Sequence, residues 1–278
     1  MNSRSVRQPK NDVQTRVTVL GARGSVPVSG KEFRRYGGAT TCFLAELGGF
    51  SVVLDAGTGL LRLPENVLAV KELPLLLTHP HTDHLLGLPM CAYVMQPGSK
   101  LTVYGARRSG LDVRSQLGCL MRTPLWPVPA DGLPAEIAFE ALPEDFTIGP
   151  VHVRSIEGIH PGGVSLIRLE RDGTSVVLIT DCTLTDALWP HALDFARGAD
   201  LLLIDGQYSE EEWAAHSSFG HNTWLRAAEF GRASGAREVR IVHHAPTHSD
   251  VVLDAASSSL SAIHPRCSFA REGEVILL

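Results

Sequence analysis

Short apolar runs of strand length recur along the whole chain, and they alternate with turn-forming residues. Residues 73–78 are almost continuously apolar, which is typical of a strand that is buried on both faces. Residues 41–47 and 51–55 are joined by Gly48 and Gly49, a pattern that predicts a hairpin. Further strands are predicted at residues 16–20, 151–155, 164–169, 175–180, 201–204, 239–242 and 274–277.

Helical periodicity is less frequent and lies mostly in the second half of the chain. Residues 223–233 have apolar positions at helical spacing, and Gly235 is placed to end this helix. Asp250 is a suitable N-cap for a helix that runs to about residue 262. Helices are also predicted at residues 183–193 and 107–120.

The order of these elements, strand pairs first and helices later in each half, predicts an α/β domain with two sheets and outer helices. Residues 16–278 contain no repeat or low-complexity linker, so we expect one domain there. Residues 1–15 are polar, lack the apolar core of a secretory signal, and are predicted to be a disordered leader. Residues 121–134 hold four prolines and are expected to form a surface loop or lid. Met121 and Trp126 in it are candidates to line a substrate pocket, and they are equally compatible with ordinary exposed apolar residues or with a dimer face.

The composition narrows the class of protein. Of 278 residues, 44% are hydrophobic and 20% charged, which suffices for a large core. The net charge of −5 leaves no large basic field for nucleic-acid phosphates, so a nucleic-acid partner is not expected. No apolar stretch approaches the roughly 20 residues of a membrane span. Five scattered cysteines without a C-x-x-C pair favour a reducing, cytoplasmic location.

The strongest chemical signal is the segment 79–84, HPHTDH, directly after a buried strand. Imidazole nitrogens and a carboxylate oxygen are the donor types that bind Zn²⁺. Four donors on one tight turn are hard to aim at a single tetrahedral ion. They can be divided between two ions, and two ions suit a reaction in which an attacking hydroxide and a leaving oxygen are both polarised. The pairs are then His79 with His81 and Asp83 with His84.

This segment resembles the signature of the metallo-β-lactamase superfamily, and motifs across residues 17–277 support the resemblance in order. The N-terminal loops resemble the branch that holds tRNase Z-like and cyclic-nucleotide phosphodiesterase-like proteins. The resemblance implies an α/β fold, a four-layer αββα sandwich of two mixed β-sheets flanked by helices. The supporting motifs are residues 20–27 (LGARGSVP), 36–41 (YGGATT), 54–59 (LDAGTG), 159–163 (IHPGG), 180–181 (TD) and 242–246 (VHHAP).

The resemblance also implies two divalent metal ions. Zinc is the preferred ion, although Mn²⁺ and Fe²⁺ use the same donors. Because each candidate ligand closes or follows an apolar run, we expect all of them at one edge of the sheets. The implied ligands are His79, His81 and His160 for the first ion, Asp83, His84 and His243 for the second, and Asp181 as the bridge.

Taken from the residues alone, several of these assignments stay open. His160 is also compatible with an ordinary loop histidine, and Asp181 with the N-cap of a helix. His243 and His244 are adjacent, so only one can continue the inward alternation of the preceding strand. The family pattern favours His243, which leaves His244 behind the ligands, against the substrate, or at the surface. Asp250 either supports His244 or only caps its helix.

A candidate for acid catalysis lies in residues 219–223, FGHNT, which resemble the Gly-His-Ser/Thr element of the same branch. There the histidine faces the substrate, and an imidazole that titrates near pH 6.5 can protonate a leaving oxygen. His221 is therefore predicted to be catalytic, together with the ligand Asp83; alternatively, His221 begins a helix that Asn222 caps. Asp205, in the related segment DGQY, is expected to orient a metal-binding histidine.

Three further residues are expected close to the metal ions. Asp55 is predicted to brace the loop of His79 through hydrogen bonds. Arg23 and Ser25 lie in glycine-containing loops near the predicted metal edge and are candidates for contacts with phosphate oxygens.

These features together predict a dinuclear metal-dependent hydrolase, a phosphodiesterase that acts on a small-molecule phosphodiester such as a cyclic nucleotide through a metal-bridging hydroxide. The resemblance implies a homodimer. A tRNase Z-like endoribonuclease is the first alternative, but the sequence shows no Gly/Pro-rich basic insertion to hold RNA. A lactone, lactam or thioester hydrolase, a redox di-iron protein and a metal-containing accessory protein without turnover are the others.

Overall fold

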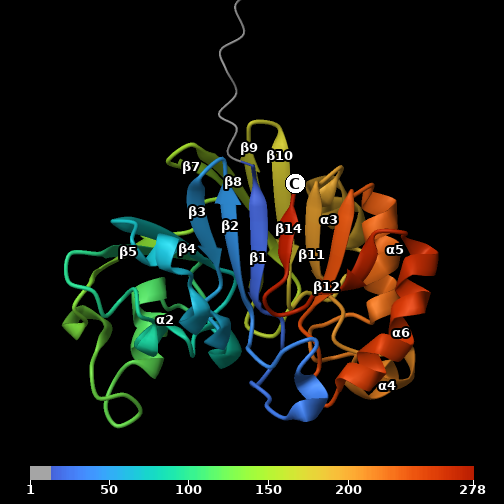
Figure 1. Cartoon of the computed structure of the whole chain (residues 1–278), viewed down its shortest axis with the longest axis horizontal. Coiled ribbons are helices and arrows are strands. Elements are labelled where there is room, and N and C mark those ends of the chain that lie inside the picture. Colours follow the sequence, from blue (N-terminus) through green and yellow to red (C-terminus); the bar gives the residue numbers. More distant parts are fainter. Residues whose placement is uncertain (1–13) are drawn as a thin grey trace, which may run out of the picture.

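The computed structural model describes residues 14–278, so residues 1–13 of the predicted leader lie outside the described part. Two seven-stranded sheets form the centre of the molecule (Figure 1). The first sheet contains, in spatial order, β14 (Val275–Leu277), β1 (Arg16–Gly21), β2 (Cys42–Leu47), β3 (Phe50–Leu54), β4 (Glu72–Leu77), β5 (Lys100–Gly105) and β6 (Glu136–Ala141). The second contains β13 (Cys267–Phe269), β12 (Glu238–Val242), β11 (Leu201–Asp205), β10 (Thr174–Ile179), β9 (Val164–Arg171), β8 (Val151–Gly158) and β7 (Asp145–Ile148).

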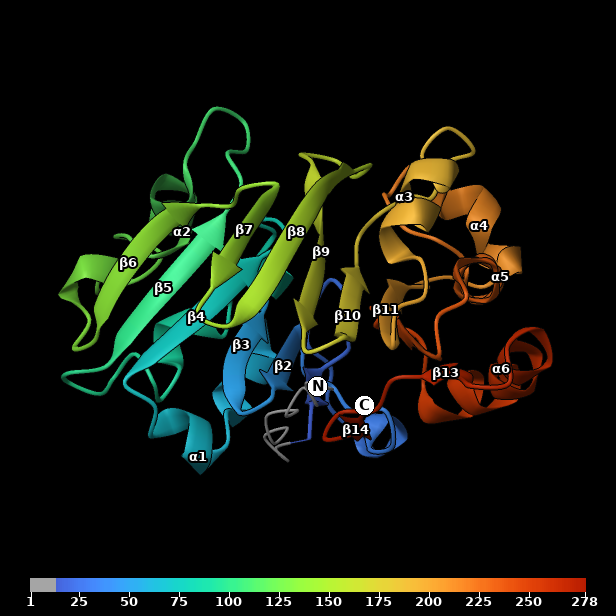
Figure 2. The same ribbon diagram turned by 90° about the horizontal axis from the view of Figure 1, so that it is seen from above.

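Helices cover the outer face of each sheet (Figure 2). Within residues 14–278 no helix combines the length and apolar character needed to cross a membrane. Helix α2 packs beside the first sheet, and α3, α5 and α6 pack on the second. The helices are α1 (Glu65–Leu68), α2 (Val113–Leu120), α3 (Trp189–Ala196), α4 (Glu210–His216), α5 (Trp224–Ser234) and α6 (Asp250–Ile263).

Three separate apolar layers hold these elements together. The central layer lies between the two sheets, where Phe43 and Leu76 of the first sheet meet Ile167 and Leu203 of the second, all fully buried. The two outer layers lie between each sheet and its helices. Three apolar layers require four layers of secondary structure. The predicted four-layer αββα sandwich of two mixed sheets is therefore confirmed.

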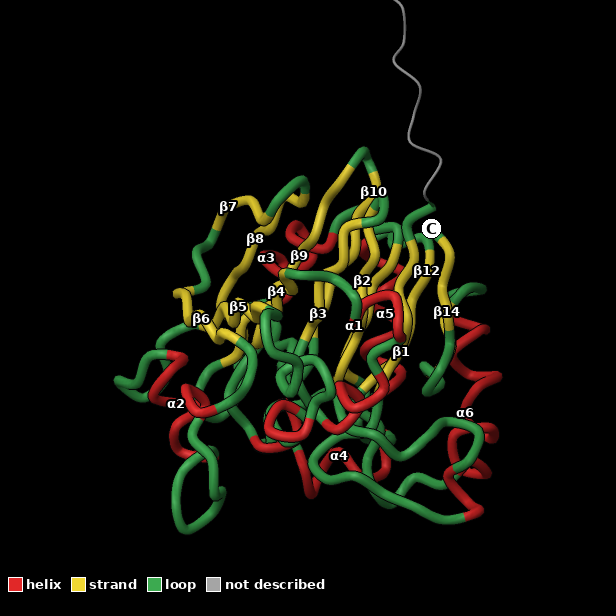
Figure 3. The backbone as a smooth tube through the Cα atoms, turned by 60° about the vertical axis from the view of Figure 1, so that its left-hand side comes forward, coloured by secondary structure: helices red, strands yellow, loops and turns green. Residues whose placement is uncertain are grey.

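Most of the loops lie below the strands of both sheets in Figure 3, and the strands that precede the site motifs run in a common direction within each sheet. In the first sheet β3 and β4 are parallel, and in the second β10, β11 and β12 are parallel. Strand β8 joins this group because it is antiparallel to β9, which is antiparallel to β10. The loops that follow six strands from both sheets thus meet at one edge, as expected from the sequence.

Some predicted helices need correction. The helix expected at 183–193 begins only at Trp189, and the one expected at 107–120 begins at Val113 with Asp112 as its N-cap. The last helix is preceded by Ser249 in the N-cap position. Asp250 accepts hydrogen bonds from the backbone N–H groups of Arg35 and Tyr36 and neither caps the helix nor contacts His244.

The proline-rich segment 121–134 forms an irregular loop with one short 3-10 turn, as predicted. The two side chains singled out in it both pack toward the first sheet. Met121 is buried, and Trp126 packs against the same apolar layer beneath the first sheet. They hold the loop onto the body of the protein. The burial of Met121 excludes the surface role predicted for it, whereas Trp126 is half-buried and its predicted role stays a prediction.

Candidate metal centre

The loops at the shared sheet edge bring together the histidines and carboxylates that the sequence singled out. Four overlapping groups of potential ligand atoms form there, and within each group all the atoms lie within 4.8 Å of one another. Two of them contain His221, one with His160 and Asp181 and one with Asp205 and His243, and the other two consist of the predicted ligands. The first group is His79, His81 and His160, and the second is Asp83, His84, Asp181 and His243. The grouping agrees with the two ligand sets that the resemblance implied, and it places His243, rather than His244, among the potential ligands.

Backbone conformation at the strand ends contributes to this convergence. Six non-glycine residues of the described chain have a positive φ, and four of them belong to the site: Ser25, Asp55, Asp181 and His243, with φ between 50° and 63°. A residue in this left-handed region costs free energy and persists only where its surroundings fix it. Each of the four follows a strand and turns sharply, which directs its side chain or backbone toward the cluster.

Asp55 fixes two ligand rings at once. It is fully buried, and it accepts hydrogen bonds from the backbone N–H and the hydroxyl of Thr78. Because the Thr78 hydroxyl donates to Asp55, its oxygen accepts from Nδ1–H of His79 at 3.1 Å. Oδ2 of Asp55 also lies 2.9 Å from Nδ1 of His84. Both histidines therefore present Nε2 to the centre, and the predicted bracing role of Asp55 agrees with this geometry.

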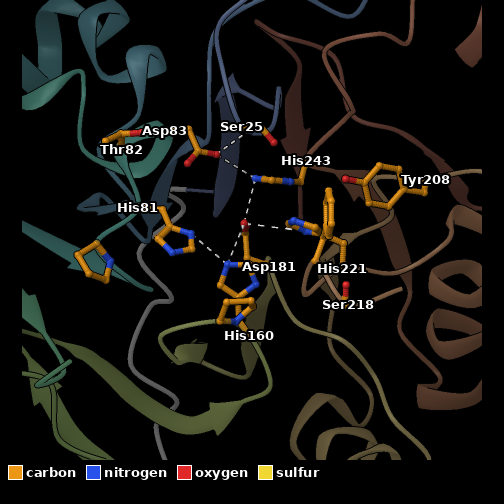
Figure 4. A pocket seen from close by; sticks show the side chains of 13 residues that line it. Ser25, His81, Thr82, Asp83, His160, Asp181, Tyr208, Ser218, His221 and His243 are labelled. Atoms are coloured by element: carbon orange, nitrogen blue, oxygen red, sulfur yellow. Dashed lines mark hydrogen bonds and ion pairs between the residues drawn. The ribbon is translucent and has the colours of Figure 1, made fainter. Parts of the chain in front are cut away.

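The first group consists of three imidazoles with converging nitrogens. Nδ1–H of His160 donates to the carbonyl of Gly220 at 3.1 Å, so its Nε2 carries the lone pair. That Nε2 lies 3.1 Å from Nδ1 of His81 (Figure 4). Burial lowers the pKa of all three histidines, most strongly for His79, where the neighbouring His84 adds to the effect. The three rings are thus neutral, the form that binds a metal ion.

The second group is built around carboxylates. Nε2 of His243 lies 3.1 Å from Oδ2 of both Asp83 and Asp181, and Nε2 of His84 lies 3.2 Å from Oδ1 of Asp181. Burial by itself lowers the pKa of His243 and His84, but the carboxylates outweigh it, Asp181 first. The pKa of His243 is raised to about 9. Burial raises the pKa of Asp83, yet His84 and His243 hold it well below its usual range. The group therefore attracts positive charge.

Asp181 lies between the two groups. Its Oδ2 is 3.8 Å from Nε2 of His79 and 3.9 Å from Nε2 of His160, while both its oxygens face the second group. The Thr180 hydroxyl donates to it at 2.6 Å, and its own backbone N–H donates to Asp205. This position is the one that a carboxylate shared by two cations needs.

The donor set fits divalent cations. Nε2 of His79 and Nε2 of His84 are buried and have no hydrogen-bond partner within the part of the chain that the structure describes. Buried polar atoms without a partner are costly, and these two face a carboxylate. Nitrogen and carboxylate donors without a thiolate are those of Zn²⁺ and similar ions. The residues can therefore hold divalent metal.

His221 and Asp205 form a pair next to the cluster. Nδ1–H of His221 donates to Oδ2 of Asp205 at 2.8 Å, and Asp205 also accepts from the backbone N–H of Asn222. Oδ2 of Asp205 is 3.6 Å from Nδ1 of His243, so it faces a ligand as well. Asn222 does not cap a helix, because Thr223 occupies the N-cap of α5. Its side chain instead bonds to the backbone of Cys182 and Leu184.

An open cleft of about 570 Å³ gives access to the cluster. Its floor includes Asp83, Asp181 and His243, and one wall includes His221 and Tyr208 (Figure 4). The volume suits a small-molecule ligand.

Three residues with predicted contacts need to be placed. Ser25 lines the cleft, and its backbone N–H donates to Asp83 at 2.8 Å. Arg23 is buried, and its guanidinium donates to the carbonyls of Gly37, Ala245 and His248. It therefore braces loops behind the site and is not available for a phosphate. His244 is also behind the site, with Nε2–H donating to the carbonyl of Ala270.

Three residues contribute to the site without having been assigned a role from the sequence. Gln207 is buried and donates to the Ser25 hydroxyl at 3.0 Å. This bond links the loop after β11 to the loop of Ser25, whose backbone N–H donates to Asp83. Tyr208 and Phe219 line the cleft. All three belong to the motifs DGQY and FGHNT, in which roles were predicted for Asp205 and His221. The local sequence does not indicate which way the other side chains point.

Comparison with known proteins agrees with this geometry. The chain is 23% identical to ribonuclease Z of Agathobacter rectalis over 83% of its own length and 88% of the relative's. It is 30% identical to ribonuclease Z of a Synechococcus strain, a match that spans 40% of this chain and only 35% of that protein. It is 24% identical to the uncharacterized protein Rv1339 of Mycobacterium tuberculosis, over 91% of this chain and 89% of that protein.

Solved structures show the same fold at low sequence identity. The metallo-β-lactamase fold protein YhfI of Bacillus subtilis has a TM-score of 0.72 at 22% identity, with 95% of this chain and 99% of that one covered. A diphosphatase of the PhnP family has a TM-score of 0.69 at 18% identity, with 95% and 97% covered. Residues 51–244 match the family model described as a beta-lactamase superfamily domain. The chain therefore belongs to the β-lactamase superfamily, as the order of its motifs predicted.

Proposed function

We propose that this superfamily hydrolase is a dinuclear phosphodiesterase that cleaves a small phosphodiester, with zinc as the favoured ion. The observation that carries the proposal is the position of His221. Its ring lines the same cleft as the carboxylates of the cluster, with Nδ1 held by Asp205 at 2.8 Å. A metal cluster beside an oriented imidazole combines a site for a phosphate with a proton donor for its leaving oxygen.

Seven side chains would hold the ions, in the two groups described above with Asp181 between them. When bound, such ions supply positive charge for phosphate oxygens and lower the pKa of a coordinated water. The protein's own contribution is to fix the donors. Asp55 sets the ring orientation of His79 through Thr78 and that of His84 directly. Hydrogen bonds of this kind hold metal-binding histidines in the correct tautomer.

His221 is suited to move a proton at Nε2. Because Nδ1–H is committed to Asp205, only Nε2 can exchange a proton with a ligand in the cleft. The hydrogen bond to Asp205 orients the ring so that Nε2 faces the cleft, where it can donate a proton to a departing alkoxide. Good leaving groups such as 4-nitrophenolate need no such proton.

The experiment compares two substrates with the variant His221→Ala. We expect the kcat for 3′,5′-cyclic AMP, which releases an alkoxide, to fall by about 100-fold or more. The kcat for bis(4-nitrophenyl) phosphate falls by less than about 10-fold, because its leaving group is weakly basic. His152→Ala, a half-exposed histidine on β8 that also pairs with an aspartate, is the control and keeps both activities. Equal losses on both substrates would contradict the assigned role of His221.

A ribonuclease Z-type activity is the second candidate, because several relatives carry that name at 23–34% identity. Precursor tRNA cleavage is therefore assayed beside the small diesters. Specific cleavage of the RNA at low protein concentration, with no turnover of either small diester, would replace the proposed function with the ribonuclease.

A further inference from the structure

The wall of the cleft beside His221 is aromatic, in contrast to the polar floor. Phe219 lines the cleft with 52% of its surface exposed. Its ring meets that of His216 edge-on, with centroids 5.2 Å apart, and His216 stacks on Tyr208 at 4.4 Å. Tyr208 in turn meets His221 edge-on at 5.9 Å. We refer to Phe219, His216 and Tyr208 as the aromatic wall: Phe219 and Tyr208 line the cleft, and the ring of His216 packs between them.

This wall is held rigidly. Helix α4 begins with a capping box in which Ser209 and Glu212 bond reciprocally to each other's backbone N–H. The carboxylate of Glu212 also contacts Nε2 of His248 at 2.9 Å, which fastens α4 to the loop after β12. Nδ1–H of His216 donates to the carbonyl of Glu212, and the N–H of Phe219 donates to the carbonyl of His216. The backbone that carries Phe219 is therefore held in place, and its half-exposed ring is available for stacking.

The aromatic wall and the metal cluster suit different parts of a ligand, because the wall offers ring faces and the cluster offers metal ligands. A phosphate needs positive charge and hydrogen-bond donors, which the cluster supplies. A fixed, half-exposed aromatic ring contributes nothing to a phosphate, but it stacks on planar rings whatever their identity. The hydroxyl of Tyr208 lies at the cleft wall, where it can bond to a polar group of a ligand (Figure 4).

We propose that the aromatic wall binds the planar base of a nucleoside phosphodiester while the phosphate lies at the cluster, so that Phe219 selects nucleotides over alkyl phosphodiesters. The proposal rests on the proposed phosphodiesterase function and specifies its substrate class. Tyr208 lies next to His221, which supports placing the base at the wall and the phosphate at the cluster. In a nucleotide the base and the phosphate are separated by a single ribose, so the two sites must be close together.

The test uses two esters with the same leaving group, thymidine 5′-(4-nitrophenyl phosphate) and methyl 4-nitrophenyl phosphate. The wild-type protein is expected to have a KM about 10-fold or more lower for the thymidine ester. Phe219→Ala raises the KM for the thymidine ester toward the value for the methyl ester and changes kcat little. Phe219→Trp, which keeps an aromatic ring, keeps the lower KM for the thymidine ester. Val251→Ala, which truncates an exposed apolar residue on α6, is the control and leaves both esters unaffected.

A binding measurement separates this inference from the proposed function. Calorimetric titration of the metal-loaded protein with AMP and with ribose 5-phosphate is expected to show tighter binding of AMP, and Phe219→Ala removes the difference. If both esters are hydrolysed with the same KM and AMP binds no better than ribose 5-phosphate, the base site is wrong while the phosphodiesterase stands. If neither ester is hydrolysed but AMP binds better through Phe219, the base site stands and the phosphodiesterase is wrong.

Discussion

Oδ2 of Asp55 lies 2.9 Å from Nδ1 of His84, and the same carboxylate orients His79 through the Thr78 hydroxyl. One buried side chain thus sets the tautomer of a histidine in each ligand group. In Asp55→Asn the amide N–H₂ faces the Nδ1–H of His84 or the donors of Thr78, so one ring is forced to turn or to exchange its proton. We expect metal affinity to fall by about 10- to 100-fold, measured by competition with a chromophoric chelator.

The control for this change is Asp145→Asn. Asp145 accepts from His152 at 2.8 Å in an exposed pair between β7 and β8, so it repeats the same chemistry away from the cluster. This variant is expected to keep the wild-type metal affinity. Unchanged affinity in Asp55→Asn, with circular dichroism showing an intact fold, would contradict the orienting role of Asp55.

Gly24 gives a second prediction, because its Cα lies against the ring of His243. A Cβ at this position would overlap Nδ1 and the neighbouring ring atoms of His243. Gly24→Ala is expected to displace His243 and to lower metal affinity by about 10-fold or more. Gly118→Ala in α2 is the matched control, since a Cβ there meets nothing within 4 Å. That substitution stabilises the helix by about 0.5–1 kcal/mol and leaves metal binding unchanged. Equal metal affinities in the two variants would contradict the prediction.

Metal binding should release protons. Asp181 and the neighbouring carboxylates raise the pKa of His243 to about 9 against the opposing effect of burial, so the ring carries a proton at neutral pH that a cation must displace. The same carboxylates raise the pKa of His84, which must also lose its proton. Apparent metal affinity is therefore expected to rise at least about tenfold for each pH unit between pH 6.5 and 8.5. Chelator competition across this range measures the slope, and calorimetry in two buffers of different ionisation enthalpy counts the protons. An affinity that is independent of pH would contradict the arrangement of the second group.

His244 links the fold to acid stability. Burial, with Arg23 nearby, lowers its pKa to about 3, against 6.5 in the unfolded chain. Between these values only the unfolded chain binds the proton, so the stability that depends on neutral His244 is complete above pH 6.5 and is lost as the pH falls toward 3. From pH 7.5 to 5.0 this loss is about 2 kcal/mol.

The measurement compares urea unfolding of the wild type and of His244→Gln at these two pH values. Glutamine keeps a donor for the carbonyl of Ala270 but does not titrate. The free energy of unfolding of the wild type is therefore expected to fall by about 2 kcal/mol more than that of the variant. Equal losses in both proteins would show that His244 does not remain neutral in the folded state.

The core of the fold and the ligand set could be predicted because their signals are local. Strand β4 is an apolar run buried along its length, and the HPHTDH segment follows it directly. Strands β5 and β6 were missed because their sequences carry residues that are depleted in strands. β5 begins with lysine and ends with glycine, and β6 has two glutamates and no fully buried position.

What the sequence could not show depends on distant contacts. The segment from residue 183 has helical periodicity, but the Asn222 side chain binds the backbone of Cys182 and Leu184 and keeps this stretch out of a helix. Arg23 appeared free for an anion, yet its guanidinium is committed to carbonyls more than 200 positions further along the chain. Neither partner can be recognised from the local sequence.

The most direct test of the account is the metal content of the purified protein after reconstitution with zinc and removal of free ions. Inductively coupled plasma mass spectrometry on the wild type is expected to give two equivalents per chain. Asp181→Asn, which weakens the carboxylate that both groups share, is expected to retain fewer and to lose diester hydrolysis. A wild-type protein that retains no metal, or a variant that retains two ions and full activity, would contradict the central claim.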